Sequence, residues 1–274
     1  MDKAMHMPSI PSFKNLRVVV LDWAGTTVDC GCRGPVRAFV ESFAAHGLEV
    51  TEAEARGPMG MGKRDHVAAM LDMPRIRDLW TKNHQAPPGQ ADIDRMYDHV
   101  QNSMMDVIAR HSAPITGAVA GVSIMRGAGL RIGSCTGYPR PVAEKMASVA
   151  ALSGFSPDCL LCATDVPHSR PSPDMCKAIL RRFALDDPRL AVKIGDTVQD
   201  ILEGKNAGMW TIGITLTGSL MGLSEDEIEA LPASRLAAAL EKAERELVAA
   251  GADFLATDIP SCLPMLERID SMLP

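Results

Sequence analysis

The sequence has few aromatic residues and no long hydrophobic run. Aromatic side chains make up 4% of its 274 residues, although hydrophobic residues together make up 46%, which is enough for a substantial core. No apolar stretch approaches the ~20 residues that a helix needs to cross a membrane. Residues 1–13 lack the apolar stretch and cleavage site of a signal peptide. We therefore expect a cytoplasmic protein without a membrane partner, and we interpret residues 1–13 as a leader without a function.

The sequence also lacks an excess of positive charge. It has 28 Lys and Arg residues against 34 Asp and Glu residues, for a net charge of −6. This balance argues against a broad nucleic-acid surface, so an anionic substrate would have to be bound by local cations. Seven cysteines are an odd count, and without a secretory signal we expect them to be reduced. Cys159 and Cys162 have the spacing of zinc or redox pairs, but no second pair matches it, and we interpret both as structural.

Short apolar stretches alternate with helical stretches over most of the chain. Strands are predicted at residues 17–21, 130–135, 190–195, 211–214 and 253–256, and helices at 139–152, 173–183 and 234–249. This order predicts an α/β fold with a doubly wound parallel sheet. Ligands of such sheets bind at the carboxyl ends of the strands. Asp22, Thr136 and Asp196 all fall at such ends, so one site is expected to contain them.

The pattern changes between residues 31 and 108, where helical stretches occur without a clear strand. Helices are predicted at residues 35–46, 51–56, 63–71 and 93–110. We therefore predict that residues 31–108 form a small helical cap domain inserted after the first strand. Residues 1–30 and 109–274 would form the α/β core.

Carboxylates follow two of the predicted strands. Asp22 ends an apolar run, and a carboxylate in that position is a candidate nucleophile, because carboxylates attack phosphorus to form aspartyl-phosphates. Asp196 ends another run, and Asp200 follows it. Mg²⁺ prefers oxygen ligands and typically binds one or two carboxylates together with phosphate oxygens. We predict a Mg²⁺ site formed by Asp22, Asp196 and the carbonyl of Ala24, with Asp200 as a further ligand or as a residue that orients the others.

Lys63 is the most informative residue of the predicted cap. It begins a predicted helix after the Gly-rich stretch of residues 57–62. The positive end of the helix dipole and the neighbouring Arg64 both disfavour an ammonium group there. We expect a lowered pKa for Lys63, which leaves more free amine for imine chemistry. His66 lies one turn further on the same helical face, where it is placed to shuttle protons.

Four motifs, in the expected order, resemble those of the haloacid dehalogenase superfamily. They are Asp22-Trp23-Ala24-Gly25-Thr26, Thr136-Gly137, Arg170-Pro171 and Gly195-Asp196-Thr197. The resemblance implies a Rossmann-like core in which Asp22 is the nucleophile. It also implies that Thr136, Gly137 and Arg170 bind a phosphoryl group. Phosphatases of the superfamily carry a second aspartate, the general acid for an alcohol leaving group, where this sequence has Ala24.

The combination of Ala24 with Lys63 resembles one family of the superfamily, the phosphonoacetaldehyde hydrolases. That family cleaves the P–C bond of phosphonoacetaldehyde into acetaldehyde and phosphate with Mg²⁺, within phosphonate degradation. The resemblance implies that Lys63 forms a Schiff base with the aldehyde and that Asp22 forms an aspartyl-phosphate. It explains Ala24, because an enamine leaving group needs no proton from an aspartate. It also implies that the protein is a homodimer through its cap. Four further residues are expected around the reacting groups: Cys32, Met59, His66 and Tyr138.

Two other functions are compatible with parts of this pattern. A phosphomonoesterase or phosphomutase of the same superfamily would use the same nucleophile, but Ala24 would leave its alkoxide leaving group unprotonated. A non-catalytic binding module is the second alternative, because a fold alone does not determine a function. The presence of Asp22, Thr136, Arg170 and Asp196 together argues against such a module.

Overall fold

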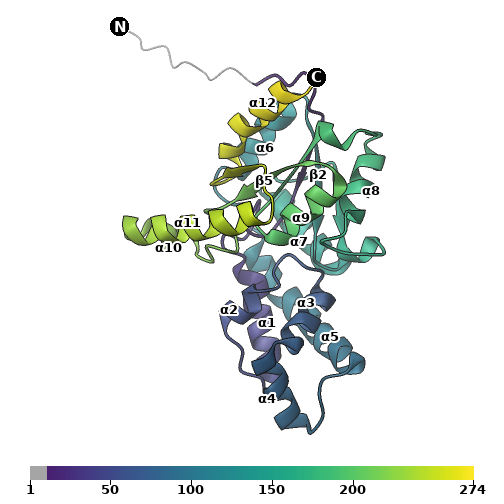
Figure 1. Ribbon diagram of the computed structural model, residues 1–274, viewed down its shortest axis with the longest axis vertical. Coiled ribbons are helices and arrows are strands. Elements are labelled where there is room, and N and C mark those ends of the chain that lie inside the picture. The colour runs from purple at the N-terminus through teal and green to yellow at the C-terminus, as the bar shows by residue number, and fades with distance from the viewer. Residues whose placement is uncertain (1–10) are drawn as a thin grey trace.

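The protein, described here by a computed structural model over residues 11–274, is built on a six-stranded sheet (Figure 1). All neighbouring strands pair in parallel, in the order β3-β2-β1-β4-β5-β6. The strands are β1 (Val18–Leu21), β2 (Arg131–Thr136), β3 (Cys159–Cys162), β4 (Ala191–Gly195), β5 (Trp210–Ile214) and β6 (Phe254–Ala256). The strand order reverses at β1, so the predicted doubly wound sheet is confirmed.

Helices cover both faces of the sheet, which is why its central strand is apolar on both sides. Val19 and Leu21 of β1 belong to a large cluster with side chains of α6, α7 and α12. Val18 and Val20 face the other way, into a cluster with α8. The core helices are α6 (Ala118–Gly127), α7 (Arg140–Leu152), α8 (Asp174–Arg182), α9 (Val198–Ala207), α10 (Glu225–Glu229), α11 (Ala233–Ala249) and α12 (Leu263–Met272).

Five of the helices between β1 and β2 gather beyond one end of the sheet (Figure 1). They are α1 (Arg33–Ala45), α2 (Glu52–Arg56), α3 (Lys63–Asp72), α4 (Pro74–His84) and α5 (Gln90–Val107). Phe39 and Phe43 of α1 pack with Met96 and Val100 of α5 in one buried cluster. These helices correspond to the predicted cap. Residues 57–62 join α2 to α3 and are called the cap loop below. The division into residues 31–108 and the remainder stays a prediction.

Several elements were not predicted from the sequence, and β3 and α4 are among them. The edge strand β3 is only four residues long, and its ends are the two cysteines that we interpreted as structural thiols. Both cysteines are free. Helix α4 buries only Ile76 and Trp80, so its polar sequence gives a weak helical pattern. The leader predicted over residues 1–13 lies largely outside the described residues. Within the described part, no helix is both long and apolar enough to cross a membrane.

Candidate active site

Asp22 follows the last residue of β1, at the edge of the sheet where ligands of doubly wound folds bind. The chain turns directly after it, because the Trp23 carbonyl accepts hydrogen bonds from the N–H groups of Thr27 (2.8 Å) and Val28 (3.0 Å). Gly25 has φ +86°, a conformation that only glycine adopts at little cost. The motif predicted around Asp22 is therefore a tight turn that leaves this carboxylate at the end of the strand.

Three buried carboxylates lie together at this edge. One oxygen from each of Asp22, Asp196 and Asp200 lies within 4.8 Å of the others. Burial, together with repulsion from Asp22 and Asp200, raises the pKa of Asp196 to about 8. The Asp196 side chain is fixed by the N–H of Ser219 (2.7 Å) and the hydroxyl of Thr26 (3.1 Å). A divalent cation would keep these crowded carboxylates ionised, and all the donors are the oxygens that a hard cation prefers. The cluster therefore fits a metal ion.

Asp200 differs from the other two carboxylates because its oxygens already have partners. Its Oδ1 lies 2.7 Å from Lys193 Nζ and 2.9 Å from Arg170 Nη1. Its Oδ2 accepts the Thr197 hydroxyl at 2.6 Å. Although burial opposes it, the two cations lower the pKa of Asp200. Of the two roles expected for Asp200, this geometry favours the one in which it orients the site.

The Ala24 carbonyl lies beside the carboxylates and is held by Cys32. The Cys32 thiol donates to this carbonyl at 2.9 Å and lies 3.5 Å from Asp196 Oδ2. Burial and the nearby Asp196 raise the pKa of Cys32 well above its ordinary value, so the thiol stays a neutral donor. Because a carbonyl oxygen has a second lone pair, Ala24 still has one free to face a cation.

Arg170 brings a positive charge to Asp22 from the loop between β3 and α8. Its Nη2 lies 2.8 Å from Asp22 Oδ1, and both side chains are buried. Thr136 ends β2, and its Oγ1 accepts the N–H of Tyr138 at 3.2 Å. Gly137 lies under the cap loop, where a Cβ atom would approach the Met61 carbonyl oxygen to 2.5 Å. The structure thus brings Thr136, Gly137 and Arg170 to the same edge as Asp22.

Lys63 is the first residue of α3, and its amine reaches the site from the cap. Only 6% of its surface is exposed. The Nζ atom lies 4.9 Å from the centre of the Tyr138 ring and 5.8 Å from that of Phe39. It is also 4.0 Å from Met59 Sδ. Two aromatic rings and a thioether thus surround the amine.

The lowered pKa expected for Lys63 is present, but its main cause differs from the one that we inferred. Burial lowers the pKa of Lys63 to about 8, while attraction to Asp22 opposes the shift. Arg64, which we had named as a cause together with the helix dipole, is half-exposed and forms an ion pair with Asp94 at 2.8 Å. A neighbouring charge that is solvated and paired has little effect at a distance.

His66 lies on the same helix as Lys63 and is completely buried. Its Nε2 is 2.9 Å from the Ala55 carbonyl, which can only accept, so Nε2 carries the proton and Nδ1 is an acceptor. The ring stacks on Phe39. Burial, reinforced by Lys63, lowers the pKa of His66 well below its ordinary value. Within residues 11–274, His66 Nδ1 and the Tyr138 hydroxyl are buried without a hydrogen-bond partner.

The cavity between these groups is small. It measures about 20 Å³ and is lined by residues from both parts of the chain, including Asp22, Thr136, Arg170 and Lys63. This volume holds about one water molecule. A second cavity of about 290 Å³ shares Lys63 and Gly137 with it and lies at the boundary between the cap helices and the core.

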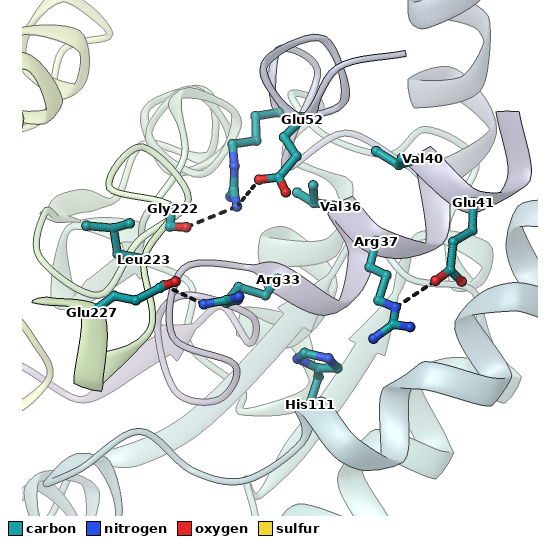
Figure 2. Close-up of a pocket in the computed structure, with 11 residues that line it drawn as sticks. Arg33, Val36, Arg37, Val40, Glu41, Glu52, His111, Gly222, Leu223 and Glu227 are labelled. Atoms are coloured by element: carbon teal, nitrogen blue, oxygen red, sulfur yellow. Dashed lines mark hydrogen bonds and ion pairs between the residues drawn. The ribbon is translucent and has the colours of Figure 1, made fainter. Parts of the chain in front are cut away.

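Figure 2 shows a wider cavity of about 430 Å³ at the base of α1. Its arginines face carboxylates: Arg33 pairs with Glu227, and Arg37 Nε lies 2.6 Å from Glu41. These pairs leave less positive charge for an anion. Asp22 and Lys63 do not line this cavity, so its size alone does not make it the candidate active site.

Sequence reasoning missed two buried residues behind the site, Lys193 and Glu203. Lys193 lies in the middle of β4, and its side chain is inaccessible to solvent. Glu203 lies on α9, one turn after Asp200, and is equally buried. A lysine within an otherwise apolar strand was the available signal, because a buried charge requires a partner. The partner could not be identified without knowing how α9 packs on β4.

Comparisons with known proteins identify the family. A family model for haloacid dehalogenase-like hydrolases matches residues 16–208. The phosphonoacetaldehyde hydrolase of Nitratidesulfovibrio vulgaris is 43% identical over 258 residues, which cover 94% of this chain and 92% of that protein. The chain belongs to the phosphonoacetaldehyde hydrolase family. The resemblance that the sequence motifs indicated is thus confirmed.

Other members of the family agree with this assignment. The phosphonoacetaldehyde hydrolase of Bacillus cereus is 39% identical, with 93% of this chain and 97% of that protein covered. The crystal structure of a phosphonoacetaldehyde hydrolase-like protein from Oleispira antarctica has a TM-score of 0.92 and 32% identity, and 97% of each chain is covered. The chain is therefore a hydrolase with the haloacid dehalogenase fold, a group whose members typically use a metal ion.

Proposed function

We propose that the protein hydrolyses the P–C bond of phosphonoacetaldehyde and releases acetaldehyde and phosphate. The observation that carries this proposal is the shared cavity of Lys63 and Asp22, an amine with a pKa of about 8 and a carboxylate, next to Ala24. An amine and a nucleophile are thus available for the two ends of one small molecule. The names of the relatives support the choice of substrate.

The first step uses Lys63 as a nucleophile toward the aldehyde carbon. Its free amine adds to the carbonyl, water leaves, and the protonated imine becomes an electron sink. Burial favours the neutral amine that this addition requires. This addition requires groups that accept and donate protons. His66 Nδ1 and the Tyr138 hydroxyl, both buried, are our candidates for this role. The imine also tethers the substrate, which removes the entropic cost of a separate encounter.

The second step uses Asp22 as a nucleophile toward phosphorus. The new O–P bond forms as the P–C bond breaks, and the electrons of that bond move into the iminium to give an enamine. Arg170, 2.8 Å from Asp22, is placed to neutralise the charge on the phosphoryl oxygens. Because the enamine leaves phosphorus without needing a proton, an acidic residue in place of Ala24 is unnecessary. The enamine then takes a proton on carbon to give an imine. Water hydrolyses the aspartyl-phosphate and the remaining imine.

We assign Mg²⁺ to the carboxylate cluster, with Asp22, Asp196 and the Ala24 carbonyl as ligands and Asp200 in support. Bound there, the ion would neutralise charge on the phosphoryl group and on the carboxylates. Asp196 and Asp200 are held by hydrogen bonds and ion pairs that do not involve the substrate. A homodimer through the cap, and a place in phosphonate degradation, remain expectations drawn from the family.

Product analysis tests the proposed function. Purified protein is incubated with phosphonoacetaldehyde, with Mg²⁺ and with a chelator, and phosphate and acetaldehyde are both quantified. We expect equimolar products that depend on Mg²⁺. Folded protein that releases neither product with Mg²⁺ would overturn the proposal. Release of phosphate from phosphate esters instead would identify a phosphomonoesterase, and the absence of both reactions would identify a non-catalytic module.

A further inference from the structure

The guanidinium of Arg170 forms buried ion pairs with three carboxylates. Its Nη2 is 2.8 Å from Asp22 Oδ1, its Nη1 is 2.9 Å from Asp200 Oδ1, and its Nε is 2.8 Å from Glu203 Oε2. The first two belong to the cluster of Asp22, Asp196 and Asp200, whereas Glu203 lies outside that cluster. Because a guanidinium is planar and its donors have fixed directions, pairing at Nε fixes the rotation of the whole group.

Glu203 is placed for this contact by α9. It lies three residues after Asp200, so both carboxylates project from the same face of the helix. Lys193 of β4 lies against this face, with Nζ 2.7 Å from Asp200 Oδ1 and 3.8 Å from Glu203 Oε2. Arg170 Nη1 and Lys193 Nζ thus share the Oδ1 atom of Asp200, and Glu203 is the carboxylate that pairs with Arg170 at Nε.

Two thiols next to Glu203 raise the question of a second metal site. One ligand atom from each of Cys135, Cys176 and Glu203 lies within 4.8 Å of the others. However, Glu203 Oε2 already accepts Arg170 Nε, and the Cys135 sulfur lies 3.3 Å from Arg170 Nη2. A divalent cation in this position would be repelled by Arg170 and Lys193. Glu203 therefore pairs with Arg170 and Lys193, and we assign no metal ion to the cluster of Cys135, Cys176 and Glu203.

We propose that Glu203 is a positioning residue that holds Arg170 in the orientation required for phosphoryl transfer. The inference rests on the proposed function, because it takes Arg170 as the ligand of the transferred phosphoryl group. During transfer, negative charge spreads over three equatorial oxygens, and catalysis depends on the alignment of the groups that face them. Binding of phosphate in the ground state depends less on the alignment of the cation than stabilisation of the transition state does. Removing the Glu203 contact should thus destabilise the transition state more than the ground state.

Anion binding tests this role without requiring turnover. Calorimetry would measure the affinities of Mg²⁺-loaded protein for inorganic phosphate and for orthovanadate, which adopts the geometry of the transferring group. In Glu203→Gln, we expect vanadate affinity to fall about 10- to 100-fold, as is typical when a residue that orients a site is lost. Phosphate affinity should change by less than about threefold, and kcat should fall with little change in KM. In Glu203→Asp, which keeps a carboxyl group on a shorter side chain, we expect a smaller loss.

Asp270→Asn is a matched control. Asp270 is a largely buried carboxylate that accepts the N–H of Leu16 and does not line the site cavity. It should lower thermal stability and leave the ratio of vanadate to phosphate affinity unchanged. Wild-type vanadate affinity in Glu203→Gln, or equal losses for both anions, would overturn the role. Should that variant not fold, wild-type vanadate affinity in Glu203→Asp would overturn it. If the wild type binds both anions but releases no acetaldehyde, the proposed substrate is refuted, and the ratios of vanadate to phosphate affinity still decide the role of Glu203. If the wild type binds neither anion, the role of Glu203 is refuted.

Discussion

Gly60 of the cap loop lies directly against Thr197 of the core, so that a Cβ atom at Gly60 would approach Thr197 Oγ1 to 2.2 Å. Thr197 is the N-cap of α9, and its hydroxyl also binds Asp200. The cap loop that leads to Lys63 therefore rests on the turn that carries the acidic residues. This contact couples the position of the Lys63 amine to the positions of Asp196 and Asp200.

Gly60→Ala should prevent this close approach. The added methyl group would collide with Thr197, and we expect kcat/KM to fall about 100-fold, because small misplacements of reacting groups are costly. Gly129→Ala is the matched control. Gly129 has the same φ of +90° but nothing within 4 Å of the added atom, so this variant has the backbone strain without the collision. Equal activity of the two variants would contradict the coupling.

Lys63→Arg should abolish imine formation while keeping the positive charge. Borohydride reduces an imine to a stable secondary amine, so mass spectrometry of protein treated with phosphonoacetaldehyde and borohydride measures the step directly. We expect a modified Lys63 in the wild type and no modification at this position in the variant, with activity reduced at least about 10⁴-fold, as for loss of a covalent nucleophile. Lys82→Arg, at an exposed position of α4, should behave like the wild type. Retained turnover in Lys63→Arg would favour a phosphatase mechanism.

The sequence predicted those parts of the site that depend on local pattern. An apolar run that ends on Asp22, followed by a glycine-containing turn, requires no knowledge of distant residues. The pKa of Lys63 shows the limit of this reasoning. Its direction was predicted correctly, but its main cause is burial by Tyr138, Phe39 and Met59, which come from different segments. Local charge alone pointed to Arg64, which proved to be solvated and paired with Asp94.

The fold shows the same division between local and distant information. A strand rich in β-branched residues, such as β1, has a strong pattern, whereas β3 contains no β-branched residue and is recognised by its pairing with β2. Lys193 and Glu203 were missed because their partnership with Arg170 depends on the packing of β4, α9 and the loop before α8. Such contacts arise from tertiary structure and leave no regular spacing in the sequence.

The activity should rise with pH through the pKa of Lys63. Only the neutral amine adds to the aldehyde, and burial lowers the pKa of Lys63 from 10.5 to about 8. We expect the rate of borohydride-trapped imine formation to rise about tenfold per pH unit between about pH 6 and pH 8 and to level off above that. Phosphate affinity, measured over the same range, separates this effect from changes in anion binding. A midpoint near the ordinary lysine value would contradict the environment described here.

Asp196→Asn should weaken binding of the divalent cation. The substitution keeps the shape of the side chain but removes a buried charge, and we expect Mg²⁺ affinity to fall at least about tenfold, because a hard cation depends on carboxylate ligands. Calorimetry with Mg²⁺ measures this directly. Asp253→Asn is the control, since Asp253 binds Thr211 and Lys205 away from the acidic cluster. Equal Mg²⁺ affinities of Asp196→Asn and the wild type would place the metal elsewhere.

Asp270→Asn should destabilise the protein without changing its chemistry. The Asp270 carboxylate accepts the N–H groups of Lys14, Asn15 and Leu16 at 2.7 to 2.9 Å and so ties the start of the core to α12. We expect a loss of about 2 kcal/mol in the free energy of unfolding at neutral pH, as for hydrogen bonds to a charged group. Urea denaturation measures it. Asp72→Asn should change stability little, because its ion pair with Arg77 is exposed.

The pH dependence of this difference provides a second check. Although burial opposes it, the three N–H groups lower the pKa of Asp270 in the folded state below its ordinary 3.8. A carboxyl group with a depressed folded pKa contributes stability that is present above its unfolded pKa and is lost as the pH falls through its folded pKa. The wild type and Asp270→Asn should therefore differ most near neutral pH and converge as the pH falls below about 4. A difference that stays constant across this range would mean that Asp270 acts through packing and not through its charge.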